Sequence, residues 1–491
     1  MAPARTWLLL FGLDLAACTA SGDAARAPVS PPARAAAAAV DAGPPGQPAG
    51  WDEALRLREA VDLDPDPHVV EVNLEARVDA VTLRPGTTTL AWTYDGGVPG
   101  PLIRVHLGDR LIVNFTNHLP EATTIHWHGL RIPVAMDGVP DHSAPKVETG
   151  ATFRYDFVVP DAGLFWYHPH VDSAAQVGDG LYGTLLVEDP AEPRGFGDQV
   201  VLQLSDVSLD DQGQLAPADQ GGAVATLFGR EGGVVLTNGR VNPVLLARVG
   251  LAQRWRIVNS AKARYFQLAL PGHRFVRIGG DGGLIGQPIE SERLLIVPGG
   301  RADVVVVPTG APGDEIALRW TAYDRGYGTA FMRPDVELLR LRLVQDAPVV
   351  PQALPATGRV IQPLDTTGAT PIAIDFTRND INKKFALGIN GVPAGMDTPL
   401  HGHVGETQIW TIGNKIDWDH PFHLHGFFFQ VLTDDGRPQE PLEWRDTVNV
   451  PVKKSVKVAV RYDDRPGMWM FHCHILDHAD AGMMGMLHLA P

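Results

Sequence analysis

The stretch FHCHILDHADAGMM, residues 471–484, concentrates side chains that bind metals. Cys473 lies between His472 and His474, and a further histidine and a methionine follow within ten residues. Neighbouring side chains on a β-strand point to opposite faces, so Cys473 must face away from both adjacent histidines. With the next histidine, an upstream imidazole and a weak thioether, this cysteine completes a His₂Cys site with axial methionine, which is typical of an electron-transfer copper.

Three more His-x-His pairs occur upstream, apart from one in a turn-like segment. Residues i and i+2 share one face of a strand, so each pair aims two imidazoles at one point. Two pairs precede residue 171 and two follow residue 422, which predicts a site between two separate parts of the chain. Neutral imidazoles in this number suit Cu, Zn, Fe or Ni. The eight residues are His126, His128, His168, His170, His423, His425, His472 and His474.

Three segments share a frame that must position these pairs. GDRLIVNFTN begins at Gly108, GLAQRWRIVN at Gly250 and GETQIWTIGN at Gly405, and each ends in Asn nine residues later. Alternating apolar residues between the Gly and the Asn predict a half-buried strand. The frames begin 142 and then 155 residues apart, so the repeating unit is a whole domain.

The three modules differ nine residues beyond the Asn. The first module reaches His126 of HWHG and the third reaches His423 of HLHG, whereas the second reaches Leu268 of QLAL. The second module is therefore expected to be a structural copy without ligands. With 52 Gly and 41 Pro, short strands between turns predict an all-β fold of consecutive β-sandwiches. We place the domains near residues 61–190, 191–350 and 351–491.

Four motifs, HWHG, WYHPH, HPFHLHG and HCHILDHADAGMM, occur in this order. Together they resemble the motifs of multicopper oxidases of the laccase kind, which have three cupredoxin domains. The resemblance covers residues 65–491. It implies Greek-key cupredoxin domains, an oxidoreductase with O₂ as acceptor, and four copper ions: one type 1, one type 2 and two type 3.

The resemblance also implies a role for each ligand. The type 1 copper would be held by His420, Cys473, His478 and Met483. The type 2 copper would be held by His126 and His423. The type 3 pair would be shared between one set, His128, His168 and His474, and a second set, His170, His425 and His472.

The implied cycle makes four one-electron oxidations at the type 1 copper and reduces O₂ to water at the other three, which requires protons. Asp137 matches the family carboxylate that hydrogen-bonds solvent near the type 2 copper; a turn Asp before Gly is the alternative. Many bacterial relatives carry Glu immediately after the residue that corresponds to His478, but this chain has Ala479. Strand geometry assures neither Asp477 nor Asp480 of facing the cluster, so we expect proton delivery to depend on Asp137.

The identity of the reductant is less constrained. An axial Met483 indicates a moderate copper potential, which fits phenols, aminophenols or low-valent metal ions. Relatives specialised for cuprous ion often carry a Met-rich insert, whereas only Met483, Met484 and Met486 cluster among the nine methionines here. We expect Met484 and Met486 to pack, and favour a laccase-like oxidase of organic reductants. A cuprous or ferrous ion oxidase for metal tolerance and a non-catalytic copper-binding cupredoxin protein are the alternatives.

Several other residues are open to two interpretations. Asp417 and Asp419 could orient a substrate or attract a cation, or they could lie in a solvated loop. Asp446 in WRDTV could support a ligand histidine or serve core hydrogen bonding. The pair His401 and His403 lies in a turn-like segment and is expected to be a decoy. Unpaired histidines are expected at the surface or in hydrogen-bonded core positions: His68, His106, His118, His142, His273 and His488. The core is expected to contain Trp166, Trp255, Trp410 and Trp469.

The N-terminus, MAPARTWLLLFGLDLAAC, resembles a bacterial lipoprotein signal over residues 1–18, with Cys18 as the lipidated residue. Ordinary signal cleavage near Ala-Ser is the alternative. Residues 19–60 are expected to form an Ala/Pro-rich tether. If Cys18 carries the lipid, Cys473 has no disulfide partner and a metal would protect its thiol.

The expected partners are a small-molecule or metal-ion reductant and O₂. A net charge of −16 argues against nucleic acid or an anionic membrane surface as a partner. We therefore expect the protein to contact the membrane only through the lipid anchor. No later run approaches the ~20 apolar residues of a spanning helix. We expect an exported, periplasmic or cell-envelope protein. A monomer suffices, because three domains in one chain already supply the interface between the first and third modules.

Overall fold

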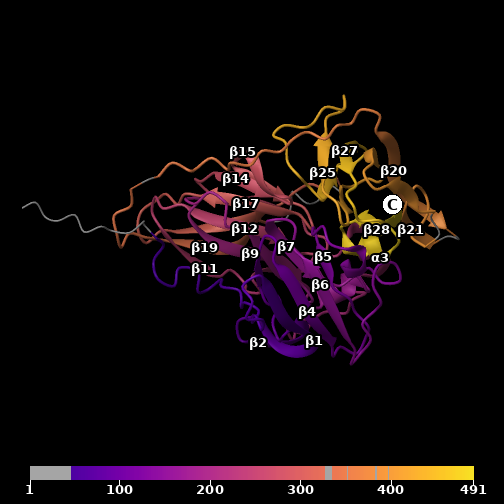
Figure 1. Cartoon of the computed structure of the whole chain (residues 1–491). Helices are drawn as coiled ribbons and strands as arrows, with labels where there is room; N and C mark the ends of the chain where they lie inside the picture. The colour runs from indigo at the N-terminus through magenta and orange to yellow at the C-terminus, as the bar shows by residue number, and fades with distance from the viewer. Residues whose placement is uncertain (1–45, 327–333, 351, 382–383, 396–397) are drawn as a thin grey trace, which may run out of the picture. The chain divides into compact units, whose positions relative to one another are not determined.

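A computed structural model describes residues 46–326, 334–350, 352–381, 384–395 and 398–491 (Figure 1). The expected signal segment with Cys18, and the tether as far as residue 45, lie outside the described residues. Residues 46–60 are packed rather than extended as a free tether. Leu55 is buried in the core of the second module, and Leu57 is buried beside Leu102 of the first. Among the described residues, no helix is long and apolar enough to cross a membrane.

The first module forms two four-stranded sheets, ordered β2-β1-β4-β6 and β3-β8-β7-β5. Its elements are β1 (Val69–Arg84), β2 (Thr87–Tyr94), β3 (Ile103–His106), β4 (Arg110–Asn117), β5 (His126–His128), the 3₁₀ helix η1 (Val134–Met136), β6 (Thr152–Val158), β7 (Gly163–His168), α1 (Ser173–Gly178) and β8 (Gly183–Glu188).

The second module forms sheets ordered β10-β9-β12-β17-β14-β15 and β11-β19-β18-β13-β16. Its elements are β9 (Asp198–Val207), α2 (Gly222–Phe228), β10 (Val234–Thr237), β11 (Val244–Arg248), β12 (Gln253–Asn259), β13 (Phe266–Ala269), β14 (Phe275–Gly280), β15 (Gly283–Ser291), β16 (Arg293–Ile296), β17 (Arg301–Val306), β18 (Glu315–Thr321) and β19 (Val336–Val344).

The third module forms sheets ordered β21-β20-β23-β27-β25 and β22-β29-β28-β24-β26. Its elements are β20 (Thr370–Ile381), β21 (Lys384–Ile389), β22 (Leu400–His403), β23 (Thr407–Asn414), β24 (His420–Leu424), β25 (Phe429–Leu432), β26 (Thr447–Val450), β27 (Ser455–Arg461), β28 (Gly467–Cys473), α3 (Leu476–Asp480) and β29 (Met484–Ala490). The described chain is therefore an all-β fold of three consecutive β-sandwiches, as the sequence predicts.

The shared Gly-to-Asn frame forms the same strand in every module: β4, β12 and β23. Each of these strands pairs in parallel with the first long strand of its module, which is β1, β9 or β20. The opening residues Gly108, Gly250 and Gly405 have φ values of 89°, 80° and 82°. Only glycine adopts this left-handed conformation without a steric penalty, so the turn before the strand requires it.

The closing Asn of the frame makes the same corner three times. Asn117, Asn259 and Asn414 are buried, and each donates two side-chain hydrogen bonds to backbone carbonyls farther along the chain. Each Oδ1 accepts the backbone N–H two residues later, at 2.9–3.0 Å. Asparagine offers two donors and an acceptor in one short side chain, which explains its presence where the chain leaves the strand.

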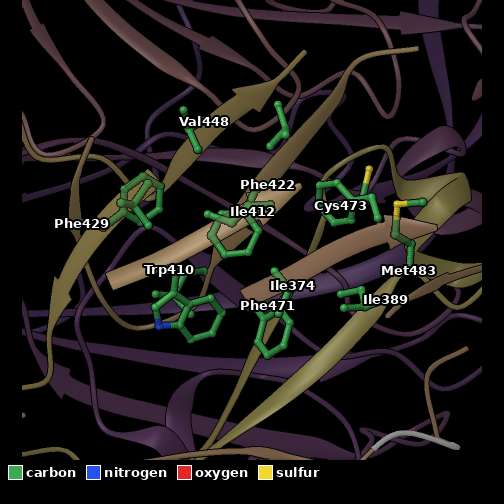
Figure 2. Packing of buried hydrophobic residues seen from close by; sticks show 14 of the residues in the cluster. Ile374, Ile389, Trp410, Ile412, Phe422, Phe429, Val448, Phe471, Cys473 and Met483 are labelled. Carbon is green, nitrogen blue, oxygen red and sulfur yellow. The ribbon is translucent and has the colours of Figure 1, made fainter. Parts of the chain in front are cut away.

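The sandwich interiors hold the expected aromatic core. Trp255 lies within the core of the second module and Trp469 within that of the third. Trp410 packs with Phe422 and Phe471 inside the third module (Figure 2). Trp166 is also fully buried, next to Leu164 of the first module. The four tryptophans are thus confirmed as core residues.

Candidate metal centre

Strand pairing brings the His-x-His pairs together within each module. β5 pairs with β7 in the register that sets His126 opposite His168. In the third module β24 pairs with β28, which sets His423 opposite His472. A buried cluster of eight imidazoles results, and each of these side chains is at most 8% exposed.

The two end modules supply this cluster jointly. The rings of His126 and His425 stack with their centroids 3.8 Å apart, and those of His128 and His423 do the same. His170 of the first module lies 5.2 Å from His472 of the third, measured between ring centroids. The imidazoles therefore converge between the first and third modules, as the spacing predicts.

In several rings, the hydrogen bond made by the outward nitrogen determines which nitrogen presents its lone pair to the centre of the cluster. The Nδ1 atoms of His126, His168, His423 and His472 donate to backbone carbonyls of Asp137, Pro169, Asp446 and Cys473 at 2.8–3.0 Å. A carbonyl only accepts, so the proton is on Nδ1 and the Nε2 lone pair points inward. His472 Nε2 faces His425 Nε2 at 3.2 Å.

Most of the inward nitrogens have no hydrogen-bond partner among the described residues: His126 Nε2, His128 Nδ1, His168 Nε2, His170 Nε2, His423 Nε2 and both nitrogens of His474. Buried polar atoms are normally paired. Converging imidazole lone pairs are what a transition-metal ion requires, so this donor set fits copper ions.

Burial keeps most of these histidines neutral. It lowers the pKa of His425 to about 3 and holds the pKa of His128, His168, His170 and the two residues flanking Cys473 well below the ordinary histidine value. The neutral imidazole is the form that binds a metal. The protein therefore keeps its ligands in the binding state at physiological pH.

Asp137 joins the modules at one side of the cluster. Its Oδ2 accepts the Nδ1–H of His425 at 2.9 Å, and its Oδ1 lies 3.3 Å from Nδ1 of His126. Burial alone would raise the pKa of Asp137, but these two imidazoles hold it well below the ordinary value. The carboxylate is ionised and ties together one ligand from each end module.

Asp446 makes similar contacts with the second stacked pair, His128 and His423. Its Oδ1 lies 3.3 Å from His128 Nε2 and 3.4 Å from His423 Nδ1. Both of its oxygens bind the guanidinium of Arg301, which is fully buried. Asp446 thus supports ligand histidines, and its charge is neutralised by the second module.

Sequence reasoning missed the contribution of that second module. Leu268 is buried in its core, as expected for a copy without ligands. Yet β17 supplies Arg301, and Gly299 lies so close that a Cβ there would be 2.9 Å from atoms of His128 and His474. The segment PGGRADV carries no spacing that reveals this role, because its partners come from other modules.

A separate group forms on the other face of β28. The ligand atoms of His420, Cys473 and His478 lie within 4.8 Å of one another and all three side chains are buried. Cys473 Sγ is 3.7 Å from His478 Nδ1 and accepts the N–H of Ile475 at 3.4 Å. Cys473 is a free cysteine. The predicted alternation is confirmed, because the sulfur faces one group while its histidine neighbours face the other.

Met483 lies next to this group. The backbone N–H of Cys473 donates to the Met483 carbonyl at 3.1 Å, and Met483 is fully buried. Figure 2 shows both sulfur atoms at the same end of the third module's core. Burial raises the pKa of the Cys473 thiol above its ordinary value, so a stable thiolate requires a bound cation, which a copper ion supplies.

Comparison with known proteins agrees with this geometry. Three family models, each described as multicopper oxidase, match residues 75–192, 199–331 and 365–490. The multicopper oxidase MmcO of Mycobacterium tuberculosis is 32% identical to this chain, over 96% of this chain and 94% of its own length. The chain belongs to the multicopper oxidase family. It is therefore an oxidoreductase with copper cofactors, built from three cupredoxin-like domains.

Relatives within the family have different names. A multicopper oxidase structure from Campylobacter jejuni, described as a metallo-oxidase, is 29% identical with a TM-score of 0.79, and the match covers 89% of this chain and 94% of that one. A laccase structure from Pediococcus acidilactici is 28% identical with a TM-score of 0.77, covering 89% and 93%. The laccase of Bacillus subtilis is 26% identical over 81% of this chain and 89% of its own length.

In this multicopper oxidase a short helix covers the outer histidine of the Cys473 group. His478 Nε2–H donates to the carbonyl of Leu227 in α2 at 3.0 Å. This fixes the tautomer so that Nδ1 faces Cys473 Sγ. Burial also lowers the pKa of His478 to about 3. A cavity of about 460 Å³ lies beside α2, and its lining includes Phe228, Gly229 and Lys262.

The two aspartates near Ala479 point elsewhere. Asp477 pairs with Arg230 of the second module. Asp480 Oδ2 accepts the backbone N–H of Ala174 at the start of α1 at 2.7 Å, and burial raises the pKa of Asp480 to about 7. Neither carboxylate is hydrogen-bonded to a ligand histidine, whereas Asp137 is.

The loop before β24 offers no free carboxylate beside His420. Asp419 is buried and accepts from Tyr323, Asn449 and the backbone of Val452 at 2.7–2.8 Å. Asp417 is exposed and pairs with Lys453 at 2.8 Å. Asp419 therefore holds the loop in place. Asp417 fits the other interpretation, a carboxylate in a solvated loop.

The remaining histidines lie outside both donor groups. His401 and His403 are exposed on β22 and belong to neither imidazole group. The unpaired histidines are exposed except His273, which is half-buried and accepts the N–H of Thr309 at 2.9 Å.

Proposed function

We propose that this protein couples four one-electron oxidations of a reductant to the four-electron reduction of O₂ to water. When bound, copper supplies the one-electron chemistry at the Cys473 group and the O₂ chemistry at the eight-histidine cluster. The observation that carries the proposal is the tripeptide His472-Cys473-His474, whose sulfur faces one donor group while its imidazoles face the other.

The donor sets support four copper ions. His420, Cys473 and His478 fit a type 1 ion, to which Met483 would add a weak thioether ligand. His126 and His423 fit the type 2 ion through their inward Nε2 atoms. For the type 3 ions, ligand atoms of His170, His425 and His472 form one close group, and those of His128 and His168 lie together near His474.

Two routes connect the groups for electrons. One follows the covalent backbone from Cys473 to its histidine neighbours. The other is the hydrogen bond from His472 Nδ1–H to the Cys473 carbonyl, at 2.9 Å. Both routes are short and buried, so the two groups act as one unit.

Asp137 is the proton-handling residue in this proposal. It accepts from His425 and lies beside His126, so its ionised carboxylate can orient a proton-donating solvent molecule close to the type 2 position. The Ala479 side chain carries no titratable group, and the carboxylates on either side of it are hydrogen-bonded to other partners.

An organic reductant such as a phenol or aminophenol fits best. The cavity beside α2 is within the size range of small-molecule sites and has an aromatic wall at Phe228. Asp417 and Asp419, the carboxylates nearest His420 in sequence, are already paired. A cuprous or ferrous ion oxidase is the second candidate, because a Campylobacter jejuni relative is described as a metallo-oxidase.

Steady-state oxygen uptake with a phenol, an aminophenol, cuprous ion and ferrous ion, measured side by side on the copper-loaded protein, tests this proposal. We expect an intense blue colour and the highest kcat/KM with an organic reductant. The highest activity with a metal ion would instead indicate a cuprous or ferrous ion oxidase. Bound copper without oxygen uptake would instead indicate a non-catalytic copper-binding protein.

We also propose that the chain is exported to the cell envelope, anchored through Cys18, and monomeric. Both imidazole groups are complete within one chain, which supports the monomer. Cell fractionation, mass spectrometry of the mature N-terminus and sedimentation of the purified protein test these three points.

A further inference from the structure

The outer face of β28 and β29 carries an accumulation of sulfur. Trp469, Phe471 and Leu487 point into the core of the third module. The alternate residues form a separate cluster with Val139 of the first module. We call this set of four, Met468, Met470, Met484 and Met486, the methionine stripe. Sequence reasoning recognised only Met484 and Met486, because strand pairing brings in the other two.

Strand register orders the stripe into three rungs. Met468 lies opposite His488, which lies opposite His401 on the neighbouring strand β22. Met470 lies opposite Met486, and Met484 lies opposite His472. Successive rungs are two residues apart, or ~7 Å along a strand. The stripe therefore runs over ~14 Å from His488 to a ligand of the eight-histidine cluster.

The outer end of the stripe is accessible. The rings of His401 and His488 are exposed, with their centroids 5.7 Å apart. Met468 is half-buried, whereas Met470 and Met486 are 6% and 8% exposed. The chain thus offers two imidazoles at the surface, thioethers in the middle and an imidazole ligand at the inner end.

Packing alone does not require this composition. Leucine or isoleucine would fill the same volume with better-defined rotamers. Thioether and imidazole are instead the donors that soft cuprous ion prefers. Val139 covers the middle rung and belongs to the loop that carries Asp137, so the stripe reaches the cluster at the contact between the end modules.

We propose that the methionine stripe is a binding and transfer route for Cu(I), which loads the eight-histidine cluster from the protein surface. The ion binds at His401 and His488, moves between thioethers by ligand exchange and is delivered at His472, without a change in oxidation state. Only the inner end rests on the proposed function; Cu(I) binding at the outer end does not.

The test compares full-length apo-protein with the double variant Met470→Leu/Met486→Leu. Leucine keeps the volume and removes the sulfur. Under argon, Cu(I) is supplied from a bicinchoninate buffer, and the uptake of copper into the protein is followed with time. We expect copper to enter the double variant about tenfold more slowly than wild type. This is the low end of the loss that follows when a residue supporting a metal ligand is replaced. Substitution His401→Ala/His488→Ala should weaken surface Cu(I) binding in the same assay.

Two controls keep the proposal falsifiable. Met136→Leu, at a half-buried methionine outside the stripe, and His118→Ala, at an exposed histidine, should load like wild type. After long exposure to excess copper, the stripe variant should match wild type in copper content and oxygen uptake. Equal loading rates for stripe variant, wild type and control would overturn the route. A fully loaded wild type without oxygen uptake would overturn the proposed function instead.

Discussion

Cys473 separates two donor groups at the scale of a single peptide. Its sulfur lies 3.7 Å from His478 Nδ1, while its carbonyl accepts the Nδ1–H of His472 at 2.9 Å. The same residue therefore binds in one group and positions a ligand in the other. Strand alternation alone turns the sulfur away from the imidazoles, which is why the sequence predicted that part. The hydrogen bond from His472 to the Cys473 carbonyl is a finding of the structure.

Replacement Cys473→Ser should remove the type 1 copper alone. Serine is similar in size but offers no soft thiolate, and the residue is fully buried. We expect loss of the blue absorption, loss of phenol oxidation and one copper fewer per chain by elemental analysis. Retention of the blue band in the purified variant would contradict the type 1 assignment.

Replacement Asp137→Asn should lower turnover at neutral pH by about 100-fold, the usual scale for losing a general acid–base group. The amide keeps the shape and one acceptor toward His425 but carries no negative charge to orient a proton donor. Copper content should stay at the wild-type level. Asp141→Asn, in an exposed position of the same loop, is the control. Turnover near wild type in Asp137→Asn would show that protons arrive by another route.

At the scale of elements, the sequence predicted most of what regular alternation controls. The Gly-to-Asn frames became β4, β12 and β23, and the His-x-His pairs became facing strands. Contacts between modules were not predictable in this way. Arg301, Gly299 and the rungs of the methionine stripe depend on which surfaces meet in three dimensions, and spacing along one strand carries no information about them.

The end of α1 gives a prediction about pH. Burial raises the pKa of Asp179 to about 6, although Lys262 opposes the shift. Between the unfolded pKa of about 4 and the folded pKa, the folded state binds more protons, so stability falls as pH rises through this window. We expect Asp179→Asn to gain about 2 kcal/mol over wild type between pH 4 and pH 7.

Chemical denaturation at both pH values measures that difference. Partial solvent access at Asp179 places the expected gain below the full value of the shift. Asp141→Asn again serves as the comparison, because its side chain is 80% exposed. A pH-independent difference between Asp179→Asn and wild type would refute the argument.

At the scale of the whole molecule, Arg301 joins all three modules. Its guanidinium donates to the carbonyl of Leu164 in the first module at 3.2 Å, to that of Asp281 in the second at 3.0 Å, and to Asp446 in the third. The second module contributes no ligand histidine, but its Arg301 holds Asp446 in place. Asp446 in turn lies against the ligand histidines His128 and His423.

Replacement Arg301→Met should cost about 3–5 kcal/mol, because it leaves the buried Asp446 charge unpaired. We expect the melting temperature to fall. We also expect the electron paramagnetic resonance signal of the type 2 copper to change, because Asp446 would no longer hold His423 in place. Arg274→Met, at an exposed arginine beside Glu290 and Glu292, should change neither quantity. An unaltered copper signal in Arg301→Met would limit Arg301 to a purely structural role.

The hydrogen bond between His478 and Leu227 bears on the range of compounds that this oxidase accepts. A reductant in the neighbouring cavity would touch Phe228 and Gly229, which follow Leu227 in the chain, whereas His478 does not line this cavity. Its electron would then reach the imidazole through this main chain, and tunnelling rates depend on driving force and distance far more than on molecular outline. Selection among reductants that can approach α2 would follow their oxidation potentials, so chemically unrelated compounds of equal potential should compete for the same enzyme.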